Sequence, residues 1–191
     1  MSVAMEDIPR RHRITVDEYY RMAEVGLLAP DARVELIDGE IIDMPPIGSP
    51  HAAMDSMINS VLTHAVGQRA IVRGGLPIRL GDMSEPQPDF ALVSPRKDFY
   101  AERHPTAADT FLAIEVSDTT LSFDLGRKMA LYARHGVPEL WVIDLKRARL
   151  HVFRRPSGNE YLEVLALDAP SSMVIEKLPG VSLDLSSVFR R

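Results

Sequence analysis

The 191-residue chain is long enough for one domain with a substantial core, and 46% hydrophobic with 26% charged residues is typical of a globular protein. It has no cysteine, which excludes disulfides and cysteine-ligated zinc, and no apolar run long enough for a transmembrane helix. Its 22 basic and 27 acidic residues, a net charge of −5, argue against a protein that coats nucleic acid but not against an enzyme whose acidic site holds a metal.

The N-terminus is charged and has no apolar signal core, so we expect a cytoplasmic protein. We predict a tail over residues 1–14 and a single domain over 15–191, because no linker or repeat divides the chain. Basic residues gather at a few places, where a solvated surface is the simplest interpretation. They are Arg10, Arg11, His12 and Arg13, then Arg69, Arg73 and Arg79, then Arg96 and Lys97.

The first predicted elements are a helix and a hairpin. Thr15 and Glu18 form a capping-box pattern that opens a helix to about Leu27. Apolar residues on both sides of Asp38-Gly39 then predict a two-residue hairpin over 33–44, with Glu35 on its first strand.

A second helix is predicted after residue 48, with Ser49 as its N-cap, Pro50 in its first turn and His51 beside them. Its apolar residues recur at helical spacing and predict one buried face. They are Met54, Met57, Ile58, Val61, Leu62 and Ala65. Short strands are expected at 70–73 and 76–80, around a turn of two glycines.

The middle of the chain alternates between apolar strands and helical signals. Asp89 begins a strand to Val93, residues 94–110 predict a loop with a helical turn, and the apolar run 111–117 predicts a central strand. A helix capped by Ser122 or Asp124 should then run to His135, where Gly136 and Pro138 end it. Lys128 lies beside its apolar face.

The last third of the chain predicts a series of strands. A strand over 139–145 carries few charges and is a candidate for pairing across a two-fold axis. A hairpin follows over 149–155 and 160–167, and the tail over 181–189 predicts a short strand and a closing turn.

Two carboxylates stand inside apolar strand patterns. Asp89 alone fits a structural role, because aspartate after proline commonly bonds nearby amides. Glu115, between Ile114 and Val116, needs a cation if it is buried and ionised. Lys128 is one candidate, although an ion pair with Asp124 four residues earlier is the simpler alternative for that lysine.

A divalent metal is the other candidate. Two carboxylates at neighbouring strand ends can hold a hard cation such as Mg²⁺. A lysine beside the metal can orient or deprotonate a water molecule and stabilise developing negative charge. These are the components that phosphodiester hydrolysis needs.

One ordered set of motifs runs through almost the whole chain, from about Thr15 to Phe189. It comprises Val34-Glu-Leu-Ile-Asp-Gly-Glu40, His51, Pro88-Asp89, Ile114-Glu-Val-Ser117, Asp124, Lys128, Tyr132 and Gly136-Val-Pro-Glu-Leu-Trp-Val-Ile-Asp144. This set resembles the Uma-type (DUF820-like) family of restriction endonucleases, within the PD-(D/E)XK nuclease superfamily. The resemblance implies an α/β fold with a restriction-endonuclease-like core: a mixed central sheet flanked by helices, with an N-terminal helix and hairpin.

The resemblance also implies roles for residues at the matching positions. Asp89 and Glu115 match the two acidic metal ligands, together with the Val116 carbonyl, and Lys128 matches the lysine. In the superfamily that lysine usually stands two residues after the second acid, where this chain has Ser117.

Two further residues match the family pattern: Glu35 as an additional carboxylate, and His51 as a contact to the substrate phosphate or to a water on the metal. For His51 a helix-start surface cap is an open alternative. The implied function is Mg²⁺- or Mn²⁺-dependent endonucleolytic cleavage of DNA by a homodimer, with no membrane partner. The alternative is a nuclease-fold module that binds a partner or nucleic acid without cleaving it.

Overall fold

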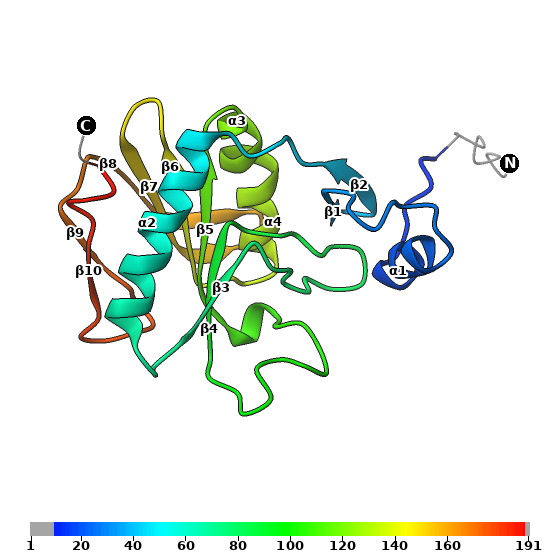
Figure 1. Cartoon of the computed structure of the whole chain (residues 1–191), viewed down its shortest axis with the longest axis horizontal. Coiled ribbons are helices and arrows are strands. Elements are labelled where there is room, and N and C mark those ends of the chain that lie inside the picture. The colour runs from blue at the N-terminus through cyan, green and yellow to red at the C-terminus, as the bar shows by residue number, and fades with distance from the viewer. Residues whose placement is uncertain (1–9, 190–191) are drawn as a thin grey trace, which may run out of the picture.

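The computed structural model describes residues 10–189, so residues 1–9 of the predicted tail lie outside it. A six-stranded mixed sheet forms the centre, in the order β3-β4-β5-β6-β7-β8 (Figure 1). Only β5 and β6 are parallel; the other neighbours are antiparallel. The strands are β3 (Ile71–Gly74), β4 (Phe90–Val93), β5 (Thr110–Ser117), β6 (Glu139–Asp144), β7 (Arg149–Ser157) and β8 (Glu160–Asp168).

One face of the sheet is covered by α2 (Ser49–Val66) and by the two-stranded pair β9 (Ser172–Val174) and β10 (Ser182–Asp184) (Figure 1). The predicted stripe of α2 is buried here, with Ile58 and Leu62 at 3% and 1% exposure. Alternate residues of β5, including Ile114, point into the same apolar layer.

The other face is covered by a single helical segment made of α3 (Leu121–Phe123), a π-helical turn η2 (Asp124–Lys128) and α4 (Met129–Arg134). Leu131 and Tyr132 pack on this face with Ala113 of β5. A 3₁₀ turn, η1 (Ala107–Asp109), is the helical turn expected in the loop before β5. Within residues 10–189, every helix is too short or too polar to span a bilayer.

The N-terminal helix α1 (Val16–Glu24) and the hairpin β1 (Val34–Ile37) and β2 (Glu40–Asp43) lie at the end of the molecule away from β9 and β10 (Figure 1). The predicted capping box of α1 is present, with Thr15 and Glu18 bonded reciprocally. Asp38 and Gly39 both have positive φ, 53° and 73°, as the predicted two-residue turn requires.

The strand predicted over 76–80 is wrong. β3 pairs directly with β4, Gly74 opposite Phe90, so the chain between them leaves the sheet. It folds on itself through Ile78 N to Pro86 O and reaches the hairpin, where Glu85 N donates to Leu36 O at 2.7 Å. The apolar residues of this segment, such as Ile78, are therefore buried under the hairpin rather than within the sheet.

The caps predicted for the two later helices are wrong. Gly48 is the N-cap of α2 and Ser49 is already helical, with Pro50 in the first turn as expected. The helical segment α3-η2-α4 begins after Thr120, so Ser122 and Asp124 both lie inside it. The Asp124 carboxylate accepts hydrogen bonds from the hydroxyls of Ser117 and Thr120, at 2.6 Å each, instead of capping the backbone.

The predicted strand over 139–145 is present as β6, but it lies between β5 and β7 in the interior of the sheet. It therefore offers no free edge for pairing across a two-fold axis. The following hairpin is longer than predicted, because Ser157 still pairs with Glu160 and only Gly158 and Asn159 remain in the turn.

A buried carboxylate ties the C-terminal segment to the sheet. Glu139 has 0% exposure and accepts hydrogen bonds from Trp141 Nε1 at 2.7 Å, Arg154 Nε at 2.9 Å and Glu176 N at 2.9 Å. Removing its charge leaves the Arg154 guanidinium without its closest counter-ion.

We therefore expect Glu139→Gln to lower the free energy of unfolding by about 2 kcal/mol in urea denaturation. Glu163→Gln is the matched control, because Glu163 contacts the same arginine at 3.7 Å but is 39% exposed. That control should change stability by less than about 0.5 kcal/mol. Equal losses in the two variants would contradict the role of Glu139.

Candidate metal-dependent active site

The antiparallel pairing of β4 and β5 brings the two acidic residues of the sequence prediction together. Phe90 lies opposite Ile114, so Asp89, one residue before β4, reaches the level of Glu115 and Val116. Asp89 Oδ2 accepts a hydrogen bond from Val116 N at 2.6 Å. Because the N–H and C=O of a strand residue point to the same side, the Val116 carbonyl faces Asp89 as well.

Side-chain alternation along β5 decides the surroundings of Glu115. Val116 points toward α2, whereas Glu115 points toward the opposite helical layer and is 3% exposed. Lys128 Nζ lies 2.8 Å from Glu115 Oε1. The Tyr132 hydroxyl donates to the same oxygen at 2.6 Å, so both donors come from the helical segment that covers this face.

Lys128 is held by two glutamates rather than by Asp124. Its Nζ is also 3.2 Å from Glu35 Oε2, and the lysine side chain is only 5% exposed. The alternative of a surface ion pair with Asp124 is therefore wrong. The hydroxyl of Ser117 binds Asp124 on the same face of β5, so the lysine amine reaches Glu115 from the helix and not from the strand.

Burial affects the pKa values of Glu115, Lys128 and Tyr132. It raises the pKa of Glu115 well above its usual range, and the Lys128 cation opposes that shift. Burial alone lowers the pKa of Lys128, but the nearby charges of Glu115 and Glu35 outweigh it and raise that pKa. Lys128 is thus a protonated hydrogen-bond donor at neutral pH. Burial next to Glu115 also raises the pKa of Tyr132.

Glu35 reaches the site because the N-terminal hairpin is fastened to the segment before β4. Glu35 Oε2 accepts a hydrogen bond from Gln87 N at 3.0 Å, and the Gln87 side chain donates to Val34 O at 3.1 Å. Glu35 is 3% exposed. The hairpin and the segment before β4 therefore bring the carboxylates of Glu35 and Asp89 to the same cavity.

The first turns of α2 approach Asp89 from the other side. His51 Nε2 lies 3.2 Å from Asp89 Oδ1 and 3.4 Å from Asp55 Oδ1. Ligand atoms of these three residues all lie within 4.8 Å of one another, the arrangement of a possible metal site. The hydrogen bond to Asp89 raises the pKa of His51. No side chain of the described residues caps α2 by a hydrogen bond, and the His51 side chain is only 17% exposed, so the open alternative of a surface cap does not describe this histidine.

Asp55 is the site residue that the sequence prediction missed. The available signal was its position four residues after His51, on the same face of a helix. Its Oδ1 is buried and accepts no hydrogen bond from the described residues. Burial and the Asp89 charge raise the pKa of Asp55 to about 6, against a partial opposing effect of His51.

Asp89 stands between two cavities. One is lined by Glu35, Glu115, Val116 and Lys128 together with His51. The other adjoins the first, shares Asp89 with it, and is lined by Asp55, Asn59 and the Gly74-Gly75 turn. The predicted residues Glu35, His51, Asp89, Glu115, Val116 and Lys128 are thus all brought to one open cavity.

The electrostatics of Asp55 yield a testable expectation. Its raised pKa means that the folded metal-free protein holds an extra proton between the ordinary 3.8 and about 6. The free energy of unfolding therefore falls as pH rises through that window. Above about pH 6 the whole of this loss is present. Asp55→Asn should raise the melting temperature of the metal-free protein by a few degrees at neutral pH, and by nothing at the acid end of the window.

The same substitution should weaken Mn²⁺ binding at neutral pH by roughly 10–100-fold in calorimetry. Ser56→Ala, at the next position of α2, is the control for both measurements, since its hydroxyl only bonds Ala52 O. Unchanged metal affinity in Asp55→Asn would exclude Asp55 as a ligand.

Comparison with known proteins gives two matches. Residues 16–186 match the Uma2 family, described as "Putative restriction endonuclease". The chain is also similar to a crystal structure of "a putative nuclease belonging to DUF820 from Anabaena variabilis ATCC 29413". The two chains share 23% identity over 92% of this chain and 97% of that chain, with a TM-score of 0.69. None of the curated proteins compared with the chain matches it. The predicted fold and family resemblance are both confirmed.

Proposed function

Because the chain belongs to the Uma2 family of restriction-endonuclease-like proteins, we propose that it is an endonuclease that hydrolyses DNA phosphodiester bonds with the help of Mg²⁺ or Mn²⁺. The observation that supports this most is the convergence of Asp89, Glu115 and Lys128 in one open cavity. Burying charged side chains generally costs stability, so the fold itself gains little from bringing these three charges together. Such clusters in a cavity are typical of functional sites.

Asp89, Glu115 and the Val116 carbonyl would hold the cation, and Asp55 and His51 would complete its surroundings from α2. The donors fit a hard divalent ion, because carboxylate and carbonyl oxygens are its preferred ligands. The buried Oδ1 of Asp55, which accepts no hydrogen bond from the described residues, fits the same purpose. When bound, such an ion withdraws charge from the phosphoryl oxygen and favours ionisation of a nearby water.

Lys128 would act as a donor and not as a base, because its raised pKa keeps it protonated. Its position between Glu35 and Glu115 fixes the ammonium at 3.2 Å and 2.8 Å from their oxygens. A donor fixed in this way can orient the attacking water and stabilise negative charge on the phosphate as the reaction proceeds. His51 would contact a phosphate oxygen, since Asp89 keeps it close to the same cavity.

The test is cleavage of supercoiled plasmid by the purified full-length chain, with Mg²⁺, with Mn²⁺ and with a chelator. We expect nicking only when a divalent ion is added. Activity that persists unchanged in the chelator would contradict the metal-dependent reaction.

A non-catalytic nuclease-fold module is the second candidate. The net charge of −5 favours it, as does the pairing of Lys128 with two glutamates, which lowers the positive charge of the cavity. Calorimetry with Mn²⁺ separates the two functions. The endonuclease should bind one or two ions per chain, and the binding module should bind none.

We further propose that residues 15–191 act as one domain within a homodimer, because two strands must be cut. β6 is interior, so a dimer must use another surface, and the edge strand β8 exposes Leu162 and Val164. Sedimentation at micromolar concentration tests this association.

A further inference from the structure

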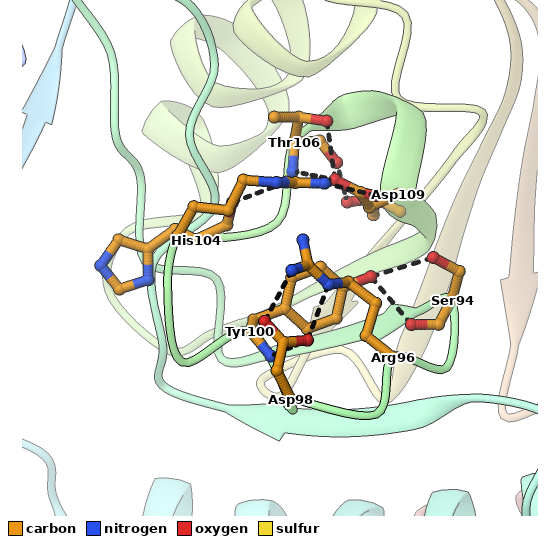
Figure 2. A network of polar contacts seen from close by, with 9 residues as sticks. Ser94, Arg96, Asp98, Tyr100, His104, Thr106 and Asp109 are labelled. Atoms are coloured by element: carbon orange, nitrogen blue, oxygen red, sulfur yellow. Dashed lines mark hydrogen bonds and ion pairs between the residues drawn. The ribbon is translucent and has the colours of Figure 1, made fainter.

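Three arginines surround one tyrosine in the loop between β4 and β5. The guanidinium carbons of Arg96, Arg73 and Arg103 lie 4.9, 5.7 and 5.7 Å from the centre of the Tyr100 ring. We call these four residues the arginine cluster. Figure 2 shows the Arg96 guanidinium against the Tyr100 ring, with Asp98 below and Asp109 and Thr106 above.

The loop holds the ring in a constrained position. The Tyr100 hydroxyl donates to Ser94 O at 2.8 Å and lies 2.9 Å from the Ser94 hydroxyl (Figure 2). Phe99 and Tyr100 are consecutive non-glycine residues with positive φ, 50° and 63°. Such strain persists only where the surroundings enforce it, and it is concentrated at functional sites.

Two of the arginines have carboxylate partners. Arg96 binds both oxygens of Asp98 at 2.8 and 2.6 Å (Figure 2). Arg103 binds both oxygens of Asp109 at 2.7 and 3.2 Å. Their side chains are 26% and 47% exposed, so solvent reaches the cluster at these two residues.

Arg73 has no such partner. It enters from β3, is 9% exposed, and makes no hydrogen bond or ion pair with any described residue. Its Nε is buried without an acceptor, and burial lowers the pKa of its guanidinium. The solvated surface that the sequence suggested for this residue is therefore wrong. A hydrophobic side chain of the same size would serve the fold better than an unpaired buried charge.

The charges of the cluster do not balance. Three guanidinium groups face two carboxylates, which leaves one positive charge without a counter-ion. The missing partner is an anion. Phosphate suits guanidinium groups in particular, because its oxygens accept several planar N–H donors at once.

The register of the sheet places Arg73 near the candidate active site. Arg73 pairs with Ala91, Ala91 pairs with Ala113, and Glu115 follows two residues along β5. Side chains in one such row share a face, and residues two apart on a strand do also. Strand spacing and rise put Arg73 and Glu115 roughly 12 Å apart at the backbone.

We propose that Arg73, Arg96 and Arg103 bind a phosphate, namely a backbone phosphodiester of the nucleic acid a few nucleotides from the bond that is cut. The identity of the ligand rests on the proposed endonuclease function; the phosphate chemistry rests on the cluster alone. Arg73 supplies the unpaired charge, and Arg96 and Arg103 supply donors at the exposed side.

The test compares Arg73→Met with Arg69→Met, which removes an exposed arginine that only bonds Ala65 O. Fluorescence anisotropy with a labelled DNA duplex, in chelator so that no cleavage occurs, is measured over a range of salt. Arg73→Met should bind more weakly, and the slope of log K against log salt should become shallower by about 0.9, the value for one phosphate contact. Arg69→Met should leave the slope unchanged.

Stability supplies a second readout. Since Arg73 is a buried charge without a partner, Arg73→Met should melt at the same or a higher temperature than the wild type. Inorganic phosphate, compared with chloride at equal ionic strength, should raise the melting temperature of the wild type and not of Arg73→Met. This arm detects phosphate binding whether or not DNA is the substrate.

Two results would overturn the inference. One is an equal salt slope in the wild type and Arg73→Met with no stabilisation by phosphate. The other is a lower melting temperature of Arg73→Met with unchanged binding, which would assign Arg73 to packing on Tyr100. Failure of the endonuclease function is distinct: metal-dependent nicking would be absent while Arg73-dependent binding remained.

Discussion

Asp89→Asn is expected to lower metal-dependent nicking by at least about 10³-fold, equivalent to roughly 4 kcal/mol of transition-state stabilisation. Asp89 is the only residue that contacts both the β5 backbone, through Val116 N at 2.6 Å, and His51, at 3.2 Å, among the described residues. Asparagine preserves its size and an oxygen that can accept the Val116 bond. It removes the charge that a cation needs.

Asp43→Asn is the matched control for this substitution. Asp43 lines the same cavity but is exposed on β2, on the hairpin side of it. We expect this variant to retain wild-type nicking. Circular dichroism and thermal melting would verify that both variants are folded. If Asp89→Asn nicked plasmid as fast as the wild type, the activity would come from a contaminant.

Lys128→Met is expected to destabilise the fold by about 3–5 kcal/mol, in addition to removing nicking activity. The methionine leaves Glu35 and Glu115 facing each other without a cation, both with side chains only 4% exposed. Such uncompensated buried charge is among the largest penalties that a single substitution can produce.

The penalty should depend on pH with a definite sign. Burial already raises the pKa of Glu115, and loss of the lysine removes the charge that opposes this shift. When the pKa of a carboxyl group is higher in the folded protein than in the unfolded chain, the folded protein loses stability as pH rises from the unfolded pKa toward the folded pKa. Urea denaturation should therefore show a smaller difference from the wild type near about pH 5 than near about pH 8.

The double variant Lys128→Met with Glu35→Gln separates charge from packing. If repulsion between the two glutamates dominates, removing one charge should recover part of the lost stability, and a double-mutant cycle measures that share. A penalty that is the same at both pH values, with no recovery in the double variant, would show that lost packing and not charge governs the effect.

The features that the sequence predicted correctly depend on interactions between residues close in the chain. The Thr15–Glu18 capping box and the Asp38-Gly39 turn are each defined by residues within four positions of one another, so the sequence alone reveals them. The apolar run around Glu115 likewise contains enough information to predict a buried strand.

The errors arise where a distant segment competes for the same groups. The segment 76–80 has apolar residues suited to a strand, but its backbone bonds to Pro105 and Pro86, and its side chains fill the space beneath the hairpin. Asp124 is a good capping residue by type, yet two hydroxyls, one of them from β5, engage its carboxylate. No local pattern reveals such partners.

The sequence by itself determined which residue types the site contains, through Asp89, Glu115, Lys128, Glu35 and His51 in a recognisable order. Only the tertiary structure decided how they meet. It paired Lys128 with two glutamates 93 and 13 residues away, added Asp55, and buried Arg73 beside Tyr100 with no carboxylate partner among the described residues. The physical reason is that the energy of a charge depends on its burial and on the charges around it, and both follow from packing between distant segments.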